Sequence, residues 1–380
     1  MTEKVLLVDD DAMVLAGLKR QLRNQFSIDT ALSGEDALKQ VLENGPYAVI
    51  VSDFMMPGMN GIEFLSRVKK SNPDTVRMML TGTADMPTAI RAVNEGSIFQ
   101  FHPKPCPAGT LCQAIQSAIG EYRKVISDQK QLNNFKSSMA QASQVQQKLM
   151  PKSDPQVDGF DIAGKSIWCD ETGGDYYDFL YPAVNGKKRI GIVVGDVTDH
   201  GIPSALLMTT ARAFLRERVQ TPPSECAAII SDVNKRLVRD VEELNLFMTM
   251  FYSEIAIKEK MIRWVKAGHE PAILYTPGTD SYELLAGEGL PLGVMEDAVY
   301  KESQKQINCG QIILIGTDGF KEAVDTHGEM FGNERLLNVI RQYADQPARY
   351  ILDKAFESLN DFRHPLEPDD DETLVVIKVL

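Results

Sequence analysis

The sequence lacks long hydrophobic runs and is poor in the residues that build disulfide or thiolate-metal frameworks. No stretch of its 380 residues approaches the roughly 18 consecutive apolar residues that a transmembrane helix needs. The five cysteines are odd in number, scattered and without metal-ligand spacing, which favours reduced thiols over disulfides. The start, MTEKVLLVDDD, lacks the layout of a signal peptide. We therefore expect a globular, cytoplasmic protein without membrane association.

Basic side chains are also fewer than acidic ones. The formal net charge is −13, and residues 151–380 carry 24 basic and 38 acidic side chains, against 11 and 13 in residues 1–120. An acidic second half argues against nucleic-acid binding and is compatible with cation binding. A length of 380 residues also exceeds that of a typical single domain. We expect two domains, at 1–120 and 151–380, with a linker at 121–150.

Residues 1–120 alternate short apolar strands with helical patterns. Five such units predict a doubly wound parallel α/β sheet of the flavodoxin-like type, whose ligands bind at the carboxyl ends of the strands. The predicted strands are Lys4–Val8, Ser27–Ala31, Ala48–Val51, Val76–Leu80 and Ile98–Phe101, with helices such as Gly34–Glu43 and Met86–Glu95 between them.

Most of these strands end in residues that can carry chemistry. Asp9 and Asp10 follow the first strand, Asp53 the third, Thr81 the fourth, and Lys104 lies just past the fifth. Clustered carboxylates repel one another unless a cation is present, and oxygen ligands of this kind suit Mg²⁺. Asp53 could then attack a phosphorus, while Lys104 and Thr81 stabilise the transferred group. The alternative is a flavodoxin-like domain without phosphotransfer.

The segments VLLVDDD, VSDFMMPGMNG, MLTGTAD and FHPKP, in this order, resemble the receiver domain of two-component response regulators. The resemblance covers roughly residues 3–120. It implies that Asp53 is the phosphoacceptor, that Phe101 is the aromatic switch residue, and that a histidine kinase or phosphotransfer protein is the partner. The implied Mg²⁺ ligands are Asp9, Asp10, Asp53 and the carbonyl of Met55.

Residues 121–150 contain no glycine or proline and carry apolar residues at a spacing of three and four. The spacing breaks once, between Ile126 and Leu132. This pattern favours a long helix with a narrow apolar stripe, which either forms a coiled coil in a homodimer or lies on a neighbouring domain. The alternative is a solvated spacer helix.

Residues 151–380 have strands in runs and helices in blocks, which predicts an α+β layered sandwich. The predicted strands are Phe160–Trp168, Asp175–Leu180, Arg189–Val194, Phe247–Ile257, Ile262–Lys266, Ile312–Gly316 and Thr373–Val379. The predicted helices are Pro203–Val219, Pro223–Asp240, Glu334–Tyr343 and Ala348–Asn360.

Four acidic motifs lie beside these strands: GGDYYD, GDVTDHG, TDG and PDDDET. Taken singly, each could be an ordinary loop with a solvated aspartate. Together they offer four carboxylates from distant parts of the sequence, without a His or Cys cluster, and such an all-oxygen set suits Mg²⁺ or Mn²⁺. Two ions could activate a bridging water and clamp the oxygens of a phosphate monoester. The candidate ligands are Asp175, Asp196, Asp318 and Asp370, with Asp371 as the alternative to the last.

The motifs LMP, ETGGDYYDF, GDVTDHGIPSALLM, FMTMFYSEI, AGHEPAILY, GLPLG, TDGFKEA and DDDETLVVI resemble the PPM family of metal-dependent serine/threonine phosphatases. They are most similar to its bacterial branch of sporulation and stress sigma-factor regulators, over residues 149–380. The resemblance implies the four aspartates as metal ligands, joined by the backbone carbonyl of Val197. Asp370 is preferred over Asp371 by its spacing to Thr373.

Three departures from the family pattern are visible, and none removes a proposed ligand. They are Asp199 before His200-Gly201, the segment Glu270-Pro271-Ala272, and Phe320-Lys321 after TDG. His200 and His269 could be general acids, although their glycine-flanked turns favour structural roles. Trp168 and Cys169 are interpreted as core or interface residues.

The sequence therefore predicts a response regulator in which phosphorylation of Asp53 controls a phosphatase that acts on phosphoserine or phosphothreonine in a protein. The resemblance implies a phosphorylated anti-sigma factor antagonist or a similar regulator as substrate. A different hypothesis is a catalytically weak adaptor that works by binding a partner. A DNA-binding transcription factor is disfavoured because the second half offers no basic recognition helix. The sequence leaves open whether phosphorylation activates or inhibits.

Overall fold

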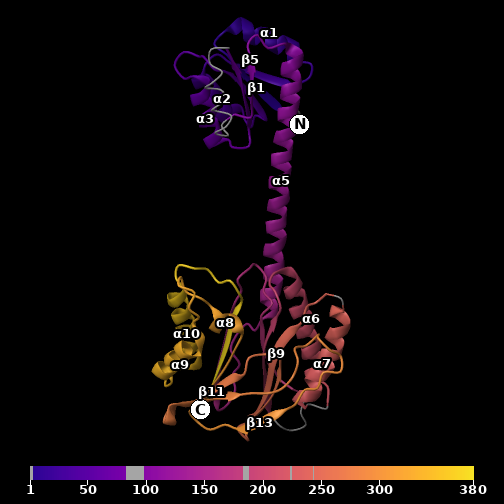
Figure 1. The fold of residues 1–380 in the computed structure, drawn as a ribbon, viewed down its shortest axis with the longest axis vertical. Coiled ribbons are helices and arrows are strands. Elements are labelled where there is room, and N and C mark those ends of the chain that lie inside the picture. The colour runs from indigo at the N-terminus through magenta and orange to yellow at the C-terminus, as the bar shows by residue number, and fades with distance from the viewer. Residues whose placement is uncertain (1–2, 83–97, 183–187, 223–224, 243) are drawn as a thin grey trace. The chain divides into compact units, whose positions relative to one another are not determined.

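The computed structural model describes residues 3–82, 98–182, 188–222, 225–242 and 244–380 (Figure 1). The chain divides into two compact units, Met1–Lys136 and Ser137–Leu380. Among the described residues, no helix is both long enough and apolar enough to cross a membrane. The predicted helix Met86–Glu95 lies outside the described residues.

The first unit contains a five-stranded parallel sheet in the order β2-β1-β3-β4-β5. This confirms the predicted doubly wound sheet. The first two strands have the predicted bounds, and the others differ from them by one or two residues. The strands are β1 (Lys4–Val8), β2 (Ser27–Ala31), β3 (Val49–Asp53), β4 (Val76–Thr81) and β5 (Gln100–Pro103).

Helices cover both faces of this sheet. Leu7 of β1 belongs to one hydrophobic cluster, with residues of α1 (Ala12–Leu22) and α5 (Ala108–Leu149). Leu6 belongs to the opposite cluster, with residues of α2 (Gly34–Asn44) and α3 (Gly61–Ser71). Consecutive strand residues point to opposite faces, so a strand buried on both sides reads as the continuous apolar run seen in the sequence.

Helix α5 runs for 42 residues without interruption. Its first turns place Leu111, Ile115 and Ala118 in the receiver core, which is why the helix begins before the predicted linker. The irregular step after Ile126 does not break the helix. Ile126, Leu132 and Phe135 are exposed, so this middle part of the predicted apolar stripe is not buried against the described residues of this chain. Pairing with a second chain remains a prediction.

The second unit is a sandwich of two five-stranded sheets, in the orders β13-β10-β9-β8-β7 and β12-β11-β14-β15-β6. Their facing sides form one hydrophobic core. Helices α6 and α7 cover the first sheet, and α8, α9 and α10 cover the second (Figure 1). The layered α+β prediction is confirmed. The strands are β6 (Phe160–Ile167), β7 (Tyr176–Leu180), β8 (Arg189–Val197), β9 (Met248–Ala256), β10 (Met261–Ala267), β11 (Ala272–Thr276), β12 (Ser281–Leu285), β13 (Ser303–Gln306), β14 (Ile312–Gly316) and β15 (Glu372–Val379). The helices are α6 (Ile202–Val219), α7 (Cys226–Val241), α8 (Asp318–Glu322), α9 (Gly332–Tyr343) and α10 (Ala348–Arg363).

Strands β11, β12 and β13 and the short helix α8 were not predicted. Strands β12 and β13 are the edges of their sheets and are mostly exposed. Edge strands with polar faces carry little hydrophobic periodicity, so a pattern search misses them.

Candidate functional site

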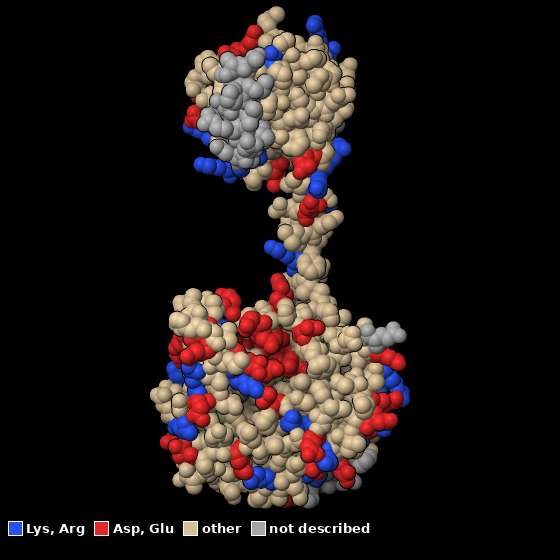
Figure 2. All heavy atoms as spheres, in the orientation of Figure 1, with Lys and Arg blue, Asp and Glu red and all other residues tan. Residues whose placement is uncertain are grey.

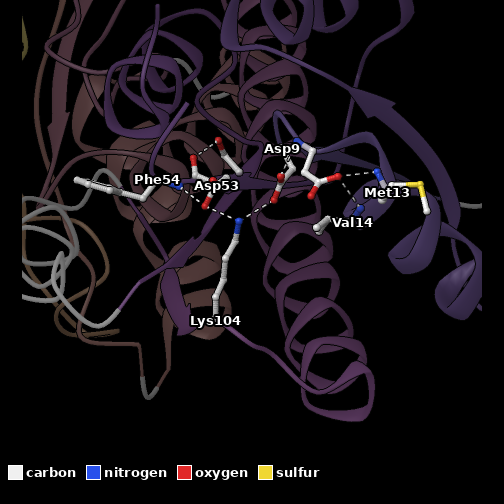
Figure 3. A network of polar contacts seen from close by, with 8 residues as sticks. Asp9, Met13, Val14, Asp53, Phe54 and Lys104 are labelled. Atoms are coloured by element: carbon white, nitrogen blue, oxygen red, sulfur yellow. Dashed lines mark hydrogen bonds and ion pairs between the residues drawn. The ribbon is translucent and has the colours of Figure 1, made fainter. Parts of the chain in front are cut away.

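The receiver carboxylates meet at the carboxyl edge of the parallel sheet. Asp53 ends β3 and Asp9 follows β1, and these strands are neighbours. Oxygens of Asp9, Asp10 and Asp53 all lie within 4.8 Å of one another. The Lys104 Nζ lies between two of these groups, 2.7 Å from Asp9 Oδ2 and 2.7 Å from Asp53 Oδ1 (Figure 3). The sheet thus brings together four of the predicted receiver residues.

The electrostatics of this cluster favour a cation. Burial raises the pKa of Asp53, and the nearby Asp9 raises it further, although Lys104 opposes both effects. Burial alone would lower the pKa of Lys104, but its contacts with Asp53 and Asp9 outweigh that effect and raise the pKa. One ammonium thus faces three carboxylates. A divalent cation with oxygen ligands would complete the neutralisation, so these residues fit Mg²⁺.

The remaining predicted receiver residues surround the cluster. Thr81 ends β4 and is buried, and β4 pairs with β3 up to Asp53. Phe101 lies on the neighbouring β5, where it packs half-buried against the α2–α3 side of the sheet. Met55 follows β3 with an exposed side chain. Thr81 and Phe101 therefore lie on the two strands beyond Asp53.

The four predicted phosphatase ligands lie at the ends of strands in both sheets of the sandwich. Asp196 is in β8 and Asp175 directly precedes β7, whose Tyr176 pairs with Gly195. Asp318 opens α8 after β14, and Asp370 lies just before β15, which pairs with β14. The Thr317 hydroxyl joins the two sheets, because it donates a 2.8 Å hydrogen bond to Asp175 Oδ2.

Burial and neighbouring carboxylates raise the pKa of Asp175, Asp196 and Asp370. Burial raises the pKa of Asp196 to about 8, with further contributions from Asp318, Asp370 and Asp371. Burial and Asp196 also raise the pKa of Asp175 well above its usual value. Figure 2 shows acidic side chains gathered on one face of the second unit. Such mutual destabilisation is relieved by bound cations.

One oxygen in this set is ready for a ligand. The Oδ1 of Asp175 is buried and has no hydrogen-bond partner. A buried carboxylate oxygen without a partner costs free energy, so such an oxygen is normally satisfied by an ordered water or a bound ion. The orphaned oxygen and the four converging carboxylates fit Mg²⁺ or Mn²⁺.

The adjacent pair Asp370-Asp371 divides into two roles. Asp371 is buried, and its oxygens accept hydrogen bonds from the backbone N–H groups of Cys169 at 2.9 Å, Gly174 at 2.7 Å and Asp175 at 3.2 Å. Asp370 accepts from the N–H of Asp371 through one oxygen, at 2.8 Å, and is exposed. Asp371 is therefore engaged in positioning the loop that carries Asp175. This favours Asp370 as the ligand.

The backbone of Gly174 lies close to Val197, and Asp178 differs in role from Asp175. A Cβ at Gly174 would lie 3.0 Å from the Val197 carbonyl oxygen, a tight contact that glycine avoids, so these two loops approach closely. The second aspartate of GGDYYD, Asp178, instead accepts two hydrogen bonds from Arg216, at 2.6 and 2.9 Å, and one from Tyr176. Asp178 is thus a structural residue of the core.

The two candidate histidines differ in their surroundings. His269 is buried, and burial lowers its pKa to about 3, so the ring is neutral. Its Nδ1 lies 2.7 Å from the Thr249 hydroxyl. His200 is exposed, and its Nδ1 lies 2.6 Å from Asp170 Oδ2, a contact that raises the pKa of the ring. These contacts agree with a structural role for His269 and leave His200 accessible.

Sequence reasoning missed Gln146, near the end of α5. Its amide donates a 2.6 Å hydrogen bond to the Gly173 carbonyl and accepts one of 3.2 Å from the Gly173 N–H. Gln146 is 4% exposed, whereas its neighbour Val145, which belongs to the apolar pattern, is 61% exposed. A search for apolar spacing selects Val145 and overlooks a buried polar residue. The last turn of α5 thus contacts the loop that carries Asp175.

Comparison with known proteins matches each of the two units to a protein family. Residues 186–380 match the family described as Stage II sporulation protein E, and residues 5–116 match the response regulator receiver domain. The chain belongs to the stage II sporulation protein E family. It therefore combines a receiver domain with a phosphatase domain of the PP2C type.

Individual relatives agree with this membership. The phosphoserine phosphatase RsbU of Bacillus subtilis is 29% identical over 246 residues, which cover 64% of this chain and 70% of that protein. Among solved structures, the RsbU and RsbW domains of Rv1364c from Mycobacterium tuberculosis are 25% identical, with a TM-score of 0.51, and the match covers 60% of this chain and 62% of that one. The SiaA-PP2C domain of Pseudomonas aeruginosa has the same fold, with a TM-score of 0.56 at 22% identity over 65% of this chain and 98% of that one.

The carboxylate repulsion in this family member leads to a prediction about stability. We expect Asp196→Asn to raise the melting temperature of the metal-free protein by about 2–4 °C, because roughly 1 kcal/mol of repulsion is removed. The same change should reduce the stabilisation that Mn²⁺ gives to the wild type. Differential scanning calorimetry with and without Mn²⁺ measures both effects, and the exposed Asp199→Asn is the control. A metal-free variant that melts lower than the wild type and responds equally to Mn²⁺ would contradict this role.

Proposed function

We propose that this chain hydrolyses phosphoserine or phosphothreonine in a protein, using two Mg²⁺ or Mn²⁺ ions. The proposed ligands are the carboxylates of Asp175, Asp196, Asp318 and Asp370 and the carbonyl of Val197. The observation that carries this proposal is the set of four converging carboxylates, one of which keeps a buried oxygen unpaired. Retention of all four also argues against a catalytically weak adaptor.

The ions, when bound, would supply an activated water and a clamp for the phosphate oxygens. The protein's contribution is to hold their ligands rigidly. Thr317 orients Asp175 through Oδ2, which leaves Oδ1 for an ion. Asp371 fixes the backbone of Gly174 and Asp175 through two hydrogen bonds. Preorganised ligands of this kind avoid the cost of rearrangement during the reaction.

A covalent cysteine mechanism is disfavoured for the thiol nearest this cluster. Burial, followed by the charge of Asp371, raises the pKa of Cys169 to about 12. The thiol is therefore protonated at neutral pH, and the thiolate is the form that acts as a nucleophile. Direct attack by water matches the surroundings better.

The substrate class is inferred from the relatives. RsbU and RsbP of Bacillus subtilis are named phosphoserine phosphatases. We propose a phosphorylated regulatory protein of the anti-sigma factor antagonist type as substrate. A folded protein substrate agrees with ligands that lie at strand ends near the surface, where Asp370 is exposed.

The test of hydrolysis is an assay on phosphoserine and phosphothreonine peptides with Mn²⁺ or Mg²⁺. We expect metal-dependent release of phosphate by the wild type and a loss of at least about 100-fold in Asp318→Asn, because one charged ligand is removed. Asp199→Asn removes a neighbouring charge that is not a proposed ligand and should retain activity. If the wild type binds a phosphoprotein but releases no phosphate with either metal, the adaptor hypothesis replaces this proposal.

We further propose that the receiver domain regulates this activity through phosphorylation of Asp53 by a histidine kinase or phosphotransfer protein. The arrangement of Lys104 between Asp53 and Asp9, with Thr81 on the next strand, supports this. Charge added at Asp53 would alter interactions with Lys104 and Thr81, which is the kind of local difference that can shift a two-state equilibrium. The exposed stripe of Ile126, Leu132 and Phe135 supports a homodimer formed through α5.

Phosphorylation can be measured directly. With Mg²⁺ and a small-molecule phosphodonor, the chain should gain one phosphoryl group at Asp53, and the phosphatase rate should change. Asp53→Ala should show neither effect, whereas Asp11→Asn, which alters a helix-capping carboxylate near the cluster, should show both. Intact-mass and peptide mass spectrometry would locate the group. Phosphate on another residue of the wild type would contradict the assignment.

Gln146 gives a prediction about coupling. Gln146→Leu removes both hydrogen bonds to Gly173 and should shift the loop that carries Asp175. We expect the Mn²⁺ concentration for half-maximal activity to rise about tenfold, which corresponds to about 1.4 kcal/mol. The exposed Gln144→Leu is the matched control. A variant with a lower melting temperature but an unchanged Mn²⁺ requirement would limit Gln146 to a structural role.

A further inference from the structure

A second group of potential metal ligands lies beside the carboxylate cluster of the phosphatase unit. Ligand atoms of Cys169, Asp170 and His200 all come within 4.8 Å of one another. The side chains of His200 and Asp170 are 57% and 44% exposed, so an ion could reach them from solvent. The proposed hydrolysis uses none of these three residues.

The three side chains come from two loops that are joined by the contact between His200 and Asp170. The N–H of Cys169 donates a 2.9 Å hydrogen bond to Asp371, which fixes the first loop. His200 lies in the turn after β8, between Asp199 at φ 62° and Gly201 at φ 85°. Its Nδ1 already contacts Asp170 Oδ2 at 2.6 Å. The ligand atoms are thus brought together before any ion binds.

The chemistry of this trio differs from that of the neighbouring carboxylates. It offers one sulfur, one nitrogen and one carboxylate oxygen, whereas the proposed hydrolytic site is made of oxygen alone. Zn²⁺ prefers four-coordinate sites with Cys and His ligands, and three protein ligands leave the fourth position for water. Thiolate and imidazole ligands select Zn²⁺ over Mg²⁺ and Mn²⁺. On binding, the thiol loses its proton to solvent as the sulfur–zinc bond forms.

We propose that Cys169, Asp170 and His200 form a Zn²⁺ site whose occupation inhibits the phosphatase. The inhibitory effect rests on the function proposed above, whereas the binding itself does not.

The position of the trio gives the reason for inhibition. The N–H of Cys169 donates a 2.9 Å hydrogen bond to Asp371, the residue next to the proposed ligand Asp370, so the three residues adjoin the carboxylate cluster. The negative charge of Asp370 and Asp371 would therefore stabilise an ion bound by Cys169, Asp170 and His200. The same two carboxylates are proposed to hold or position the hydrolytic ions. Cations bound at two neighbouring sites repel each other, so each weakens the affinity of the other site for its ion. This coupling must act in both directions. Zn²⁺ should raise the Mn²⁺ requirement, and Mn²⁺ should weaken Zn²⁺ binding.

Binding is tested on the full chain with Co²⁺, the usual spectroscopic substitute for Zn²⁺, in saturating Mg²⁺. A cobalt–thiolate bond gives a charge-transfer band in the near ultraviolet that carboxylate sites cannot produce. We expect this band in the wild type, its loss in Cys169→Ser and its weakening in His200→Ala, with displacement by Zn²⁺. The matched control is Cys309→Ser, which removes an exposed thiol elsewhere in the same unit. Absence of the band, or its loss only in Cys309→Ser, overturns the site.

Inhibition is tested separately with the phosphopeptide assay. Cys169→Ser keeps the backbone hydrogen bond to Asp371 and should retain basal activity, but it should need at least about tenfold more Zn²⁺ for half-inhibition than the wild type. Equal Zn²⁺ sensitivity of the two proteins refutes inhibition through this site. If no variant hydrolyses phosphopeptide, the proposed function fails, while the cobalt band still decides whether the metal site exists.

Discussion

Repulsion between carboxylates that the fold forces together is the constraint on which both units depend. In the receiver, neighbouring parallel strands bring Asp9 and Asp53 to one edge, where Lys104 contacts both carboxylates and offsets part of their charge. In the sandwich, four aspartates converge from two sheets, and burial raises the pKa of Asp196 to about 8. Neither arrangement favours stability by itself. Such sites persist because packing elsewhere in the domain outweighs the local cost.

The residues that hold these carboxylates matter as much as the carboxylates themselves. Asp371 is an acidic residue next to a proposed ligand, yet its oxygens are occupied by the N–H groups of three residues of the loop from Cys169 to Asp175. It thereby acts as a clamp for a segment rich in glycine. Gly173 and Gly174 give that segment the room to approach neighbouring chain, and the clamp removes the flexibility that glycine brings.

The sequence was sufficient for the parts of the fold that carry strong local patterns. The parallel strands Lys4–Val8 and Ser27–Ala31 were predicted with their observed bounds, and so was Ile312–Gly316 in the sandwich. Polar edge strands such as β12 were missed, because tertiary pairing holds them in place and their own periodicity does not.

In the candidate site, too, residues within sequence motifs were predicted, whereas roles that depend on tertiary contacts were not. Motif order selected the acidic residues, since each motif contains its aspartate. Spacing to Thr373 favoured Asp370 over Asp371, but the physical difference between them lies in which backbone N–H groups face each side chain. The sequence pattern also did not reveal Gln146, whose partner Gly173 is 27 positions away and whose burial depends on packing within the second unit. Contacts of this kind leave no local signal in the sequence.

The free energy of the hydrogen bonds between Gln146 and Gly173 is of a magnitude that suits regulation. A buried polar group that loses its partner costs about 1–3 kcal/mol, and Gln146 satisfies two backbone groups of the loop at once. A change of 1.4 kcal/mol shifts an equilibrium about tenfold, so making or breaking this contact would be enough to change the population of an ordered Asp175 loop substantially. The remaining proposed ligands come from strand ends and α8, so a shift of the last turn of α5 does not need to move them. A small displacement of the last helical turn could therefore control metal affinity without unfolding the sandwich.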